Sequence, residues 1–231
     1  LIAAAYATAI ARIAEADLVP AHLAPATVTL GETRAFYNPN LRSQWFILPG
    51  LVGILVLIVA LAVTAFSIAR EREIGTYDQL LVTPLRPHEL VIGKTVPALL
   101  LGMAESVLFI AVATLGYGVP LIGDLALLFL AVLAFLLSVV GIGLAISTLA
   151  ATQQQAMFGG FLFVVPAVIL SGFATPIENM PEAVQTLTWA NPMRYFMVIS
   201  RGIFLKDLPA EVYWAQLWPM LAIAAVTLTG A

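Results

Sequence analysis

Residues 70–94 read REREIGTYDQLLVTPLRPHELVIGK, and they carry eight of the chain's 23 charged side chains (13 acidic and 10 basic). This stretch separates two long apolar segments: residues 46–69 contain no charge, and residues 95–123 contain only Glu105. A charge-dense turn between two membrane helices is a place where a membrane protein can receive force from a partner in the water phase. We therefore look first for function in this central turn, residues 70–94.

Composition indicates the class of protein. The 231 residues are 61% hydrophobic and 10% charged, whereas soluble domains average roughly 45–50% and 25%. Crossing the ~30 Å hydrocarbon core of a bilayer takes about 20 apolar helical residues, and no charge occurs between residues 125 and 177. The sequence thus predicts an all-α, polytopic helical membrane protein with spans at residues 46–69, 95–115, 125–150, 156–175 and 212–231.

Composition also disfavours some kinds of site. The chain has no cysteine, so it forms no disulfide and no thiolate metal site. Its two histidines are too few and too far apart in sequence to argue for a metal site, and the net charge of −3 gives no indication of nucleic-acid binding. We expect the sequence to be truncated at both ends, with at least one earlier transmembrane helix missing.

The chain divides into two regions at the first span. Residues 1–45 contain an Ala-rich stretch that predicts a short helix at 1–17 and an alternating stretch that predicts a strand at 27–30. We interpret them as the end of an aqueous domain, and residues 46–231 as the transmembrane domain. Residues 176–211 are too broken for a clean span and predict short interfacial or re-entrant helices. The density of Lys and Arg favours the central turn as cytoplasmic.

The central turn predicts a short, rigid helix at 74–82. Thr76 and Gln79 match the Ser/Thr-x-x-Glu/Gln capping box, while Pro84 ends the helix and Pro87 keeps the next link extended. The result would be an amphipathic helix on the membrane surface. The simpler interpretation is a solvated loop with a stop-transfer charge cluster.

Four segments together are similar to ABC-2 type transporter permeases of the bacterial multidrug-export branch. They are the central turn, FYNPNLR at 36–42, SGFATPIENMP at 171–181, and NPMRYF at 191–196 followed by RGIFLK at 201–206. The resemblance covers nearly everything from residue 36 onward and keeps the motifs in order. Tyr77 and Asp78 stand where Met and Glu are common in the family, a difference that bears on the identity of the partner.

The resemblance implies six transmembrane helices per subunit in the bacterial inner membrane, a periplasmic insert between the first two, and re-entrant helices before the last. This chain would supply helices two to six, and residues 1–45 would end the insert. In the family, the central turn contains a coupling helix that docks on a separate cytoplasmic ABC ATPase, which holds the ATP and magnesium, so no cofactor is expected in this chain. The positions expected to act in docking and coupling are Glu71, Arg72, Glu73, Gly75, Thr76, Asp78 and Gln79.

Two further features have a structural and a functional interpretation. Glu105 is the one ionisable residue inside a predicted span, and such residues usually face the bundle interior. It is a candidate for the substrate path; alternatively it bonds to Ser or Thr on a neighbouring helix or snorkels. Small residues at roughly one-turn spacing, Ser138, Gly141 and Ala145, predict close helix packing or, alternatively, a subunit interface.

The predicted function is that of a permease subunit, not an enzyme, in an ATP-driven exporter of a hydrophobic or amphipathic substrate. Its expected partners are the cytoplasmic ATPase, a second permease copy or a sister permease, and membrane lipid, with no nucleic acid. One alternative is a permease for lipid-linked glycan or another polymer. An alternative from a different class is a polytopic lipid-modifying enzyme, which would require clustered Asp, His or Arg at a membrane face.

Overall fold

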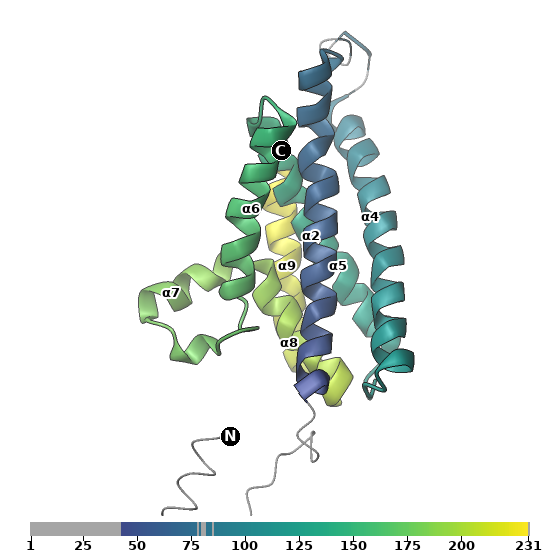
Figure 1. The fold of residues 1–231 in the computed structure, drawn as a ribbon, viewed down its shortest axis with the longest axis vertical. Coiled ribbons are helices and arrows are strands. Elements are labelled where there is room, and N and C mark those ends of the chain that lie inside the picture. Colours follow the sequence, from purple (N-terminus) through teal and green to yellow (C-terminus); the bar gives the residue numbers. More distant parts are fainter. Residues whose placement is uncertain (1–42, 78, 80–81, 85, 231) are drawn as a thin grey trace, which may run out of the picture. The chain divides into compact units, whose positions relative to one another are not determined.

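A computed structural model of the chain (Figure 1) describes residues 43–77, 79, 82–84 and 86–230. All regular structure in these residues is helical, which confirms the all-α prediction. The helix predicted at 1–17, the strand predicted at 27–30 and nearly all of the predicted 1–45 domain lie outside the described residues. The helices are α2 (Ser43–Ile74), α4 (Pro87–Ala111), the π-helical turn η1 (Val112–Gly116), α5 (Leu125–Leu149), α6 (Gln153–Ile169), η2 (Ile177–Asn179), α7 (Glu182–Leu187), η3 (Thr188–Ala190), α8 (Pro192–Leu205) and α9 (Ala210–Gly230).

Among the described residues, four helices are long and apolar enough to cross a membrane: α2, α4 continued by η1, α5 and α9. A helix satisfies its backbone hydrogen bonds internally, which is what a chain in hydrocarbon requires. These helices coincide with the spans predicted at 46–69, 95–115, 125–150 and 212–231. However, α2 and α4 both continue into the central turn, so the segment between them is much shorter than residues 70–94.

The span predicted at 156–175 is wrong in its bounds. Helix α6 has 17 residues, which gives a length of about 25 Å, less than the roughly 30 Å of a hydrocarbon core. It begins earlier than predicted, at Gln153, and ends at Ile169. Gly172 follows with a φ of 81°, a left-handed conformation that glycine adopts at little cost. The apolar residues after Ile169 therefore continue as a turn.

Helix α5 forms the centre of the bundle. In the most apolar 18-residue stretch of each helix, 56% of α5 is buried, against 44%, 28% and 22% of α2, α4 and α9. The Ser138 hydroxyl donates a hydrogen bond to the carbonyl oxygen of Met220 on α9 (2.6 Å). A Cβ on Gly141 would lie 2.1 Å from Oγ1 of Thr227, also on α9. Close helix packing at these small residues is confirmed, and the partner helix belongs to the same chain.

Residues 176–211 separate into an outlying part and a buried part. Figure 1 shows α7 standing away from the other helices, whereas α8 lies among them. The ring of Phe196 on α8 stacks on Phe135 of α5 at a centroid distance of 4.5 Å, and the Ser200 hydroxyl donates to the carbonyl oxygen of Pro49 (2.8 Å). Helix α8 therefore forms part of the core, and the assignment of residues 176–211 as interfacial or re-entrant stays a prediction.

The directions of the helices define two ends of the bundle. Helix α8 contacts the first turns of α2, and its Ile203 carbonyl oxygen accepts a hydrogen bond from the Gly123 amide before α5 (2.9 Å). We call this the opposite end, because it lies across the bundle from the central turn. The last turns of α2 and α5 meet at the other end, where the Ser147 hydroxyl oxygen accepts hydrogen bonds from the amides of Ile68 (2.9 Å) and Ala69 (3.0 Å). This turn end contains the central turn and the link between α5 and α6.

Candidate functional site

The charged residues that open the central turn form the last turn of α2, and Gly75 ends that helix. Gly75 has a φ of 81°. Its amide donates to the Arg72 carbonyl oxygen (3.1 Å), and the Thr76 amide donates to the Glu71 carbonyl oxygen (2.9 Å). These two bonds constitute a Schellman motif, the common helix ending in which a left-handed glycine reverses the chain. Gly75 therefore has a structural role in setting the direction in which the turn leaves α2.

Glu71 connects α2 to α4. One of its carboxylate oxygens pairs with the ammonium group of Lys94, and the two side chains are 25% and 20% exposed. An ion pair with this little exposure is screened less by water and salt than a surface pair. Lys94 thus lies inside α4 and supplies the cation of an interhelical ion pair.

Arg72 connects α2 to the end of α5. Its Nη1 donates to the carbonyl oxygens of Thr148 (2.5 Å) and Ala150 (3.3 Å). The last carbonyls of a helix have no partner inside it and carry the negative end of its dipole, so a cation there is favourable. The guanidinium carbon also lies 4.8 Å from the ring centroid of Tyr77, within cation–π range. Arg72 therefore holds both the end of α5 and the chain that follows Gly75.

Glu73 connects α2 to the start of α6. Its Oε2 accepts hydrogen bonds from the backbone amide of Gln153 (2.9 Å) and from the side-chain amide of the same residue (3.0 Å). Gln153 is the first residue of α6, where the amides are unpaired within the helix and a carboxylate is favourable. The Glu73 side chain is exposed to solvent.

Three consecutive residues of α2 thus contact three different helices. Successive side chains leave an α-helix about 100° apart because it has 3.6 residues per turn. Glu71, Arg72 and Glu73, which we call the charged triplet, consequently point to α4, α5 and α6 in order. The end of α2 is therefore connected to α4, α5 and α6 through the charged triplet.

The helix predicted at 74–82 differs from the structure in its start and its cap. Ile74 is the last residue of α2 and is 61% exposed, while Tyr77 lies beyond the left-handed Gly75 and packs on a cluster of buried residues from α2, α4 and α5. The amide of Gln79 donates to the carbonyl oxygen of Thr76 (3.1 Å) and not to its hydroxyl, which donates to the Glu71 carbonyl oxygen (3.3 Å). The predicted capping box is therefore wrong, because the Gln79 amide bonds the Thr76 carbonyl oxygen and the Thr76 amide bonds the Glu71 carbonyl oxygen (2.9 Å).

The outer part of the central turn faces solvent. Tyr77 and Gln79 are helical; Asp78, another predicted coupling residue, lies outside the described residues. Gln79 is exposed, as are residues 82–84, and Val82 is 85% exposed. The turn beyond Tyr77 thus offers exposed surface, in addition to that of Glu73, Ile74 and Gly75 at the end of α2.

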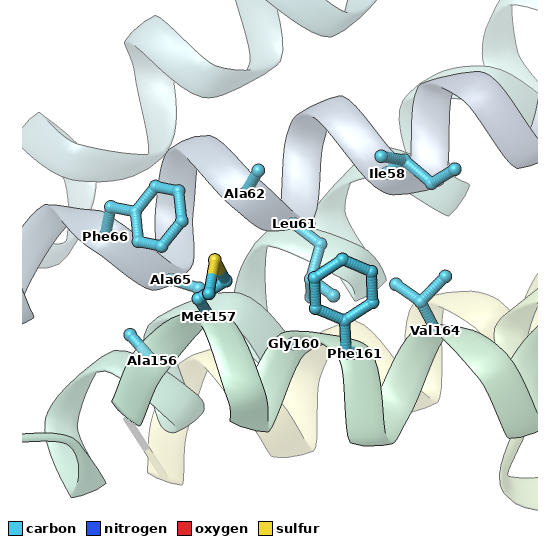
Figure 2. Close-up of a pocket in the computed structure, with 10 residues that line it drawn as sticks. All are labelled: Ile58, Leu61, Ala62, Ala65, Phe66, Ala156, Met157, Gly160, Phe161 and Val164. Carbon is cyan, nitrogen blue, oxygen red and sulfur yellow. The ribbon is translucent and has the colours of Figure 1, made fainter. Parts of the chain in front are cut away.

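A groove of about 290 Å³ lies between α2 and α6 (Figure 2). Figure 2 shows side chains of both helices along it, with Phe66, Met157 and Phe161 over the space between the two ribbons. Its walls carry no charged side chain. The lining residues are Ile58, Leu61, Ala62, Ala65, Phe66, Ala156, Met157, Gly160, Phe161 and Val164. An apolar space of this kind suits a hydrophobic molecule or an apolar protein surface.

Glu105 is not among the residues that line this groove. It lies on α4, is half-buried, and one of its carboxylate oxygens is buried with no hydrogen-bond partner in the described part of the chain. A hydrogen bond from Glu105 to Ser or Thr of a neighbouring helix is therefore not seen among these residues. Its predicted place in a substrate path stays a prediction.

Sequence reasoning identified the charged triplet but missed what it contacts. Neither Lys94 nor Gln153 is among the positions that the sequence predicted to act in coupling. The Schellman motif had a signal, because a glycine directly after the last helical residue with a basic residue in the last turn is typical of a helix end. The contacts of Arg72 had none, since Thr148 and Ala150 supply backbone oxygens.

Comparisons with known proteins agree on one family. The family model for the ABC-2 type transporter matches residues 12–205. The chain is 46% identical over 194 residues to the probable multidrug ABC transporter permease YbhR of Escherichia coli (strain K12), covering 84% of this chain and 53% of that protein. It is 38% identical over 178 residues to the probable multidrug ABC transporter permease YbhS of the same organism, covering 75% and 46%.

A third relative is the inner membrane transport permease YhhJ of Escherichia coli (strain K12), with 32% identity over 201 residues, 86% of this chain and 53% of that protein. The chain thus spans about half the length of the curated relatives that it matches. No solved structure matches it.

Proposed function

Because this chain belongs to the ABC-2 type transporter family, we propose that it is the membrane-spanning part of a permease subunit in an ATP-driven exporter of the bacterial inner membrane. ATP and magnesium are bound by a separate cytoplasmic ATPase subunit, and this chain provides the path for the substrate. The observation that carries the proposal is a charged turn at one end of an apolar helical bundle, attached through three consecutive residues to three neighbouring helices.

The ATPase docks on the outer part of the central turn. This part includes Asp78 and the exposed Gln79 and residues 82–84. It lies at the end of α2 and α4, so a displacement there moves two membrane helices directly. The turn end is accordingly the cytoplasmic end of the bundle, in agreement with the density of Lys and Arg in the central turn.

The substrate is hydrophobic or amphipathic. The groove between α2 and α6 supports this class because its lining is entirely apolar and it is open along one side, where Phe161 is 59% exposed. A complete path requires a second permease, either another copy of this protein or a sister subunit, facing the first. The relatives YbhR and YbhS are named as probable multidrug permeases, a substrate class that such a lining would suit.

The test is co-purification of the full-length protein with its candidate ATPase from membranes. Asp78→Lys reverses a charge in the proposed docking surface, and Glu178→Lys makes the same change at an exposed position of η2, at the opposite end. We expect the wild-type protein and Glu178→Lys to retain the ATPase and Asp78→Lys to lose it. A wild-type protein that binds no ATPase would overturn the exporter proposal in favour of the membrane-enzyme alternative, whereas full binding by Asp78→Lys would mean that docking occurs elsewhere.

A further inference from the structure

We propose that the charged triplet consists of positioning residues that transmit movement within the permease, and that these residues do not dock on the ATPase. This inference rests on the proposed exporter function. It divides the central turn into two parts: an outer part that receives the ATPase, and an inner part that passes the displacement to α4, α5 and α6.

The first argument is that each charged group of the triplet already has a partner within the chain, with one oxygen of Glu71, Oε2, left buried and without a partner among the described residues. The carboxylate of Glu71 pairs with Lys94, the guanidinium of Arg72 bonds to two carbonyl oxygens at the end of α5, and the carboxylate of Glu73 accepts both amides of Gln153. A partner that bound these groups would first have to break those contacts. Binding at the apolar side chain of Val82, which is 85% exposed, would break no such polar contact.

The second argument concerns the link between α5 and α6. Helix α5 ends at Leu149 and α6 begins at Gln153, so only residues 150–152 join them. Arg72 holds the end of α5 on one side of this link, and Glu73 holds the start of α6 on the other. A link this short, fixed at both sides by adjacent residues of one helix, moves with that helix.

The third argument connects the triplet to the groove. Helices α2 and α6 form its two walls, and Ala156, one turn beyond Gln153, is buried against Ala65 and Ala69 of α2. The contact between Glu73 and Gln153 therefore lies at the point where the two walls converge. Displacing α2 with this contact intact carries both walls together. Without it, α2 moves alone and the response of α6 is lost.

The experiment uses the full-length permease with its ATPase in lipid nanodiscs, on a cysteine-free background. Spin labels at Ile74→Cys and Gln154→Cys, both exposed positions outside the proposed docking surface, report the distance between the end of α2 and the α5–α6 link with and without a non-hydrolysable ATP analogue. The variant is Glu73→Ala. The matched control is Arg70→Ala, an exposed charged residue one turn earlier on α2 for which the described part of the chain shows no hydrogen bond or ion pair.

We expect Glu73→Ala to retain the ATPase within about twofold of wild type and to lose about fivefold or more of ATP-dependent export, the lower range of coupling between distant sites. The label distance should stay constant through the nucleotide cycle in the wild-type protein and in Arg70→Ala, and it should change with nucleotide in Glu73→Ala. If Glu73→Ala no longer binds the ATPase, Glu73 takes part in docking. If Glu73→Ala exports at the wild-type level, Glu73 takes no part in coupling. Either result overturns the inference.

A charge exchange provides a second, independent test. Glu71→Lys and Lys94→Glu each place like charges at the α2–α4 contact and should lower export, whereas the double variant restores an opposite pair and should recover it. Recovery would not occur if Glu71 bound a fixed cation on the ATPase. Failure of the double variant to export, with the ATPase still bound, would overturn the inference and leave the exporter proposal intact. A wild-type complex that never forms would instead be a failure of the exporter proposal itself.

Discussion

Both ends of the helical bundle contain buried apolar packing, but they differ in the contacts that surround it. At the opposite end, α8 is buried among α2, α5 and α9, with Phe196 stacked on Phe135. At the turn end, the charged triplet contacts the neighbouring helices through ions and hydrogen bonds, some of them open to solvent. Close-packed apolar contacts tolerate little displacement, whereas exposed polar contacts can exchange with water and form again.

Two arginines show that the difference does not lie in residue type. Arg201, on α8, donates to the carbonyl oxygens of Gly172 (3.1 Å) and Phe173 (3.3 Å) and lies 3.9 Å from the ring centroid of Phe46. Arg72 also donates to carbonyl oxygens at a helix end and lies near an aromatic ring. Arg201 does so within an apolar, aromatic surrounding. Arg72 does so beside a solvent-facing turn, and we infer that the turn end is the part that moves during transport.

The largest expected effect is the loss of packing at the opposite end. The Phe196 side chain is fully buried, and replacing a buried Phe by Ala costs about 3–5 kcal/mol through the cavity that remains. We therefore expect Phe196→Ala to lower the thermal unfolding temperature of the purified protein by at least about 5 °C. Phe158→Ala on α6, where the ring is 62% exposed, is the matched control and should change it little. Equal shifts for both variants would show that the opposite end is not densely packed.

Two glycines contrast a closely packed position between α5 and α2 with an exposed position on α4. A Cβ on Gly143 of α5 would lie 1.9 Å from Oγ1 of Thr64 and 3.3 Å from the Leu61 carbonyl oxygen, whereas one on Gly93 of α4 would meet nothing within 4 Å. Gly143→Ala should destabilise the protein by about 1–3 kcal/mol, the usual cost of overpacking. Gly93→Ala should be neutral or stabilise it, since alanine is the better helix former by about 1 kcal/mol.

Thermal unfolding of both glycine variants in the same detergent is the measurement. If Gly143→Ala leaves the unfolding temperature unchanged, α2 and α5 can separate where Gly143 faces Thr64. The boundary between the rigid and the mobile part would then lie closer to the opposite end.

The spans were largely predictable because each is an apolar run with charges or turn residues at its ends. Helix α5 was predicted to within one residue, and the Asp124 side chain that precedes it caps the helix by accepting a hydrogen bond from the Ala126 amide (2.7 Å). Helix α8 was not predictable as a core element from the same rule. It carries Arg194 and Arg201, which favour an interface, and only the fold supplies the carbonyl oxygens that allow Arg201 to lie in the core.

The site was predictable in position but not in mechanism. The family motif at residues 70–94 located the residues of the central turn, but the partners of the charged triplet lie 23 to 80 positions away in sequence. Those of Arg72 are backbone atoms, which carry no sequence signature. The predicted surface helix was placed too early because Ile74 fits an apolar pattern that in fact ends at a left-handed glycine.

The smallest expected effect concerns that glycine. A φ of 81° raises the conformational energy of an L-residue with a Cβ by roughly 1–2 kcal/mol, and that of Asn by less, because the Asn side chain forms local hydrogen bonds. We expect Gly75→Ala to lower the unfolding temperature only slightly and Gly75→Asn still less, since this end contributes little to global packing.

The informative readout is amide hydrogen exchange. The Thr76 amide, which donates to the Glu71 carbonyl oxygen, should exchange faster in Gly75→Ala, while the amides of α8 keep their wild-type protection. Faster exchange in α8 as well would mean that the two ends are one cooperative unit, and that the turn end cannot move while the opposite end stays rigid.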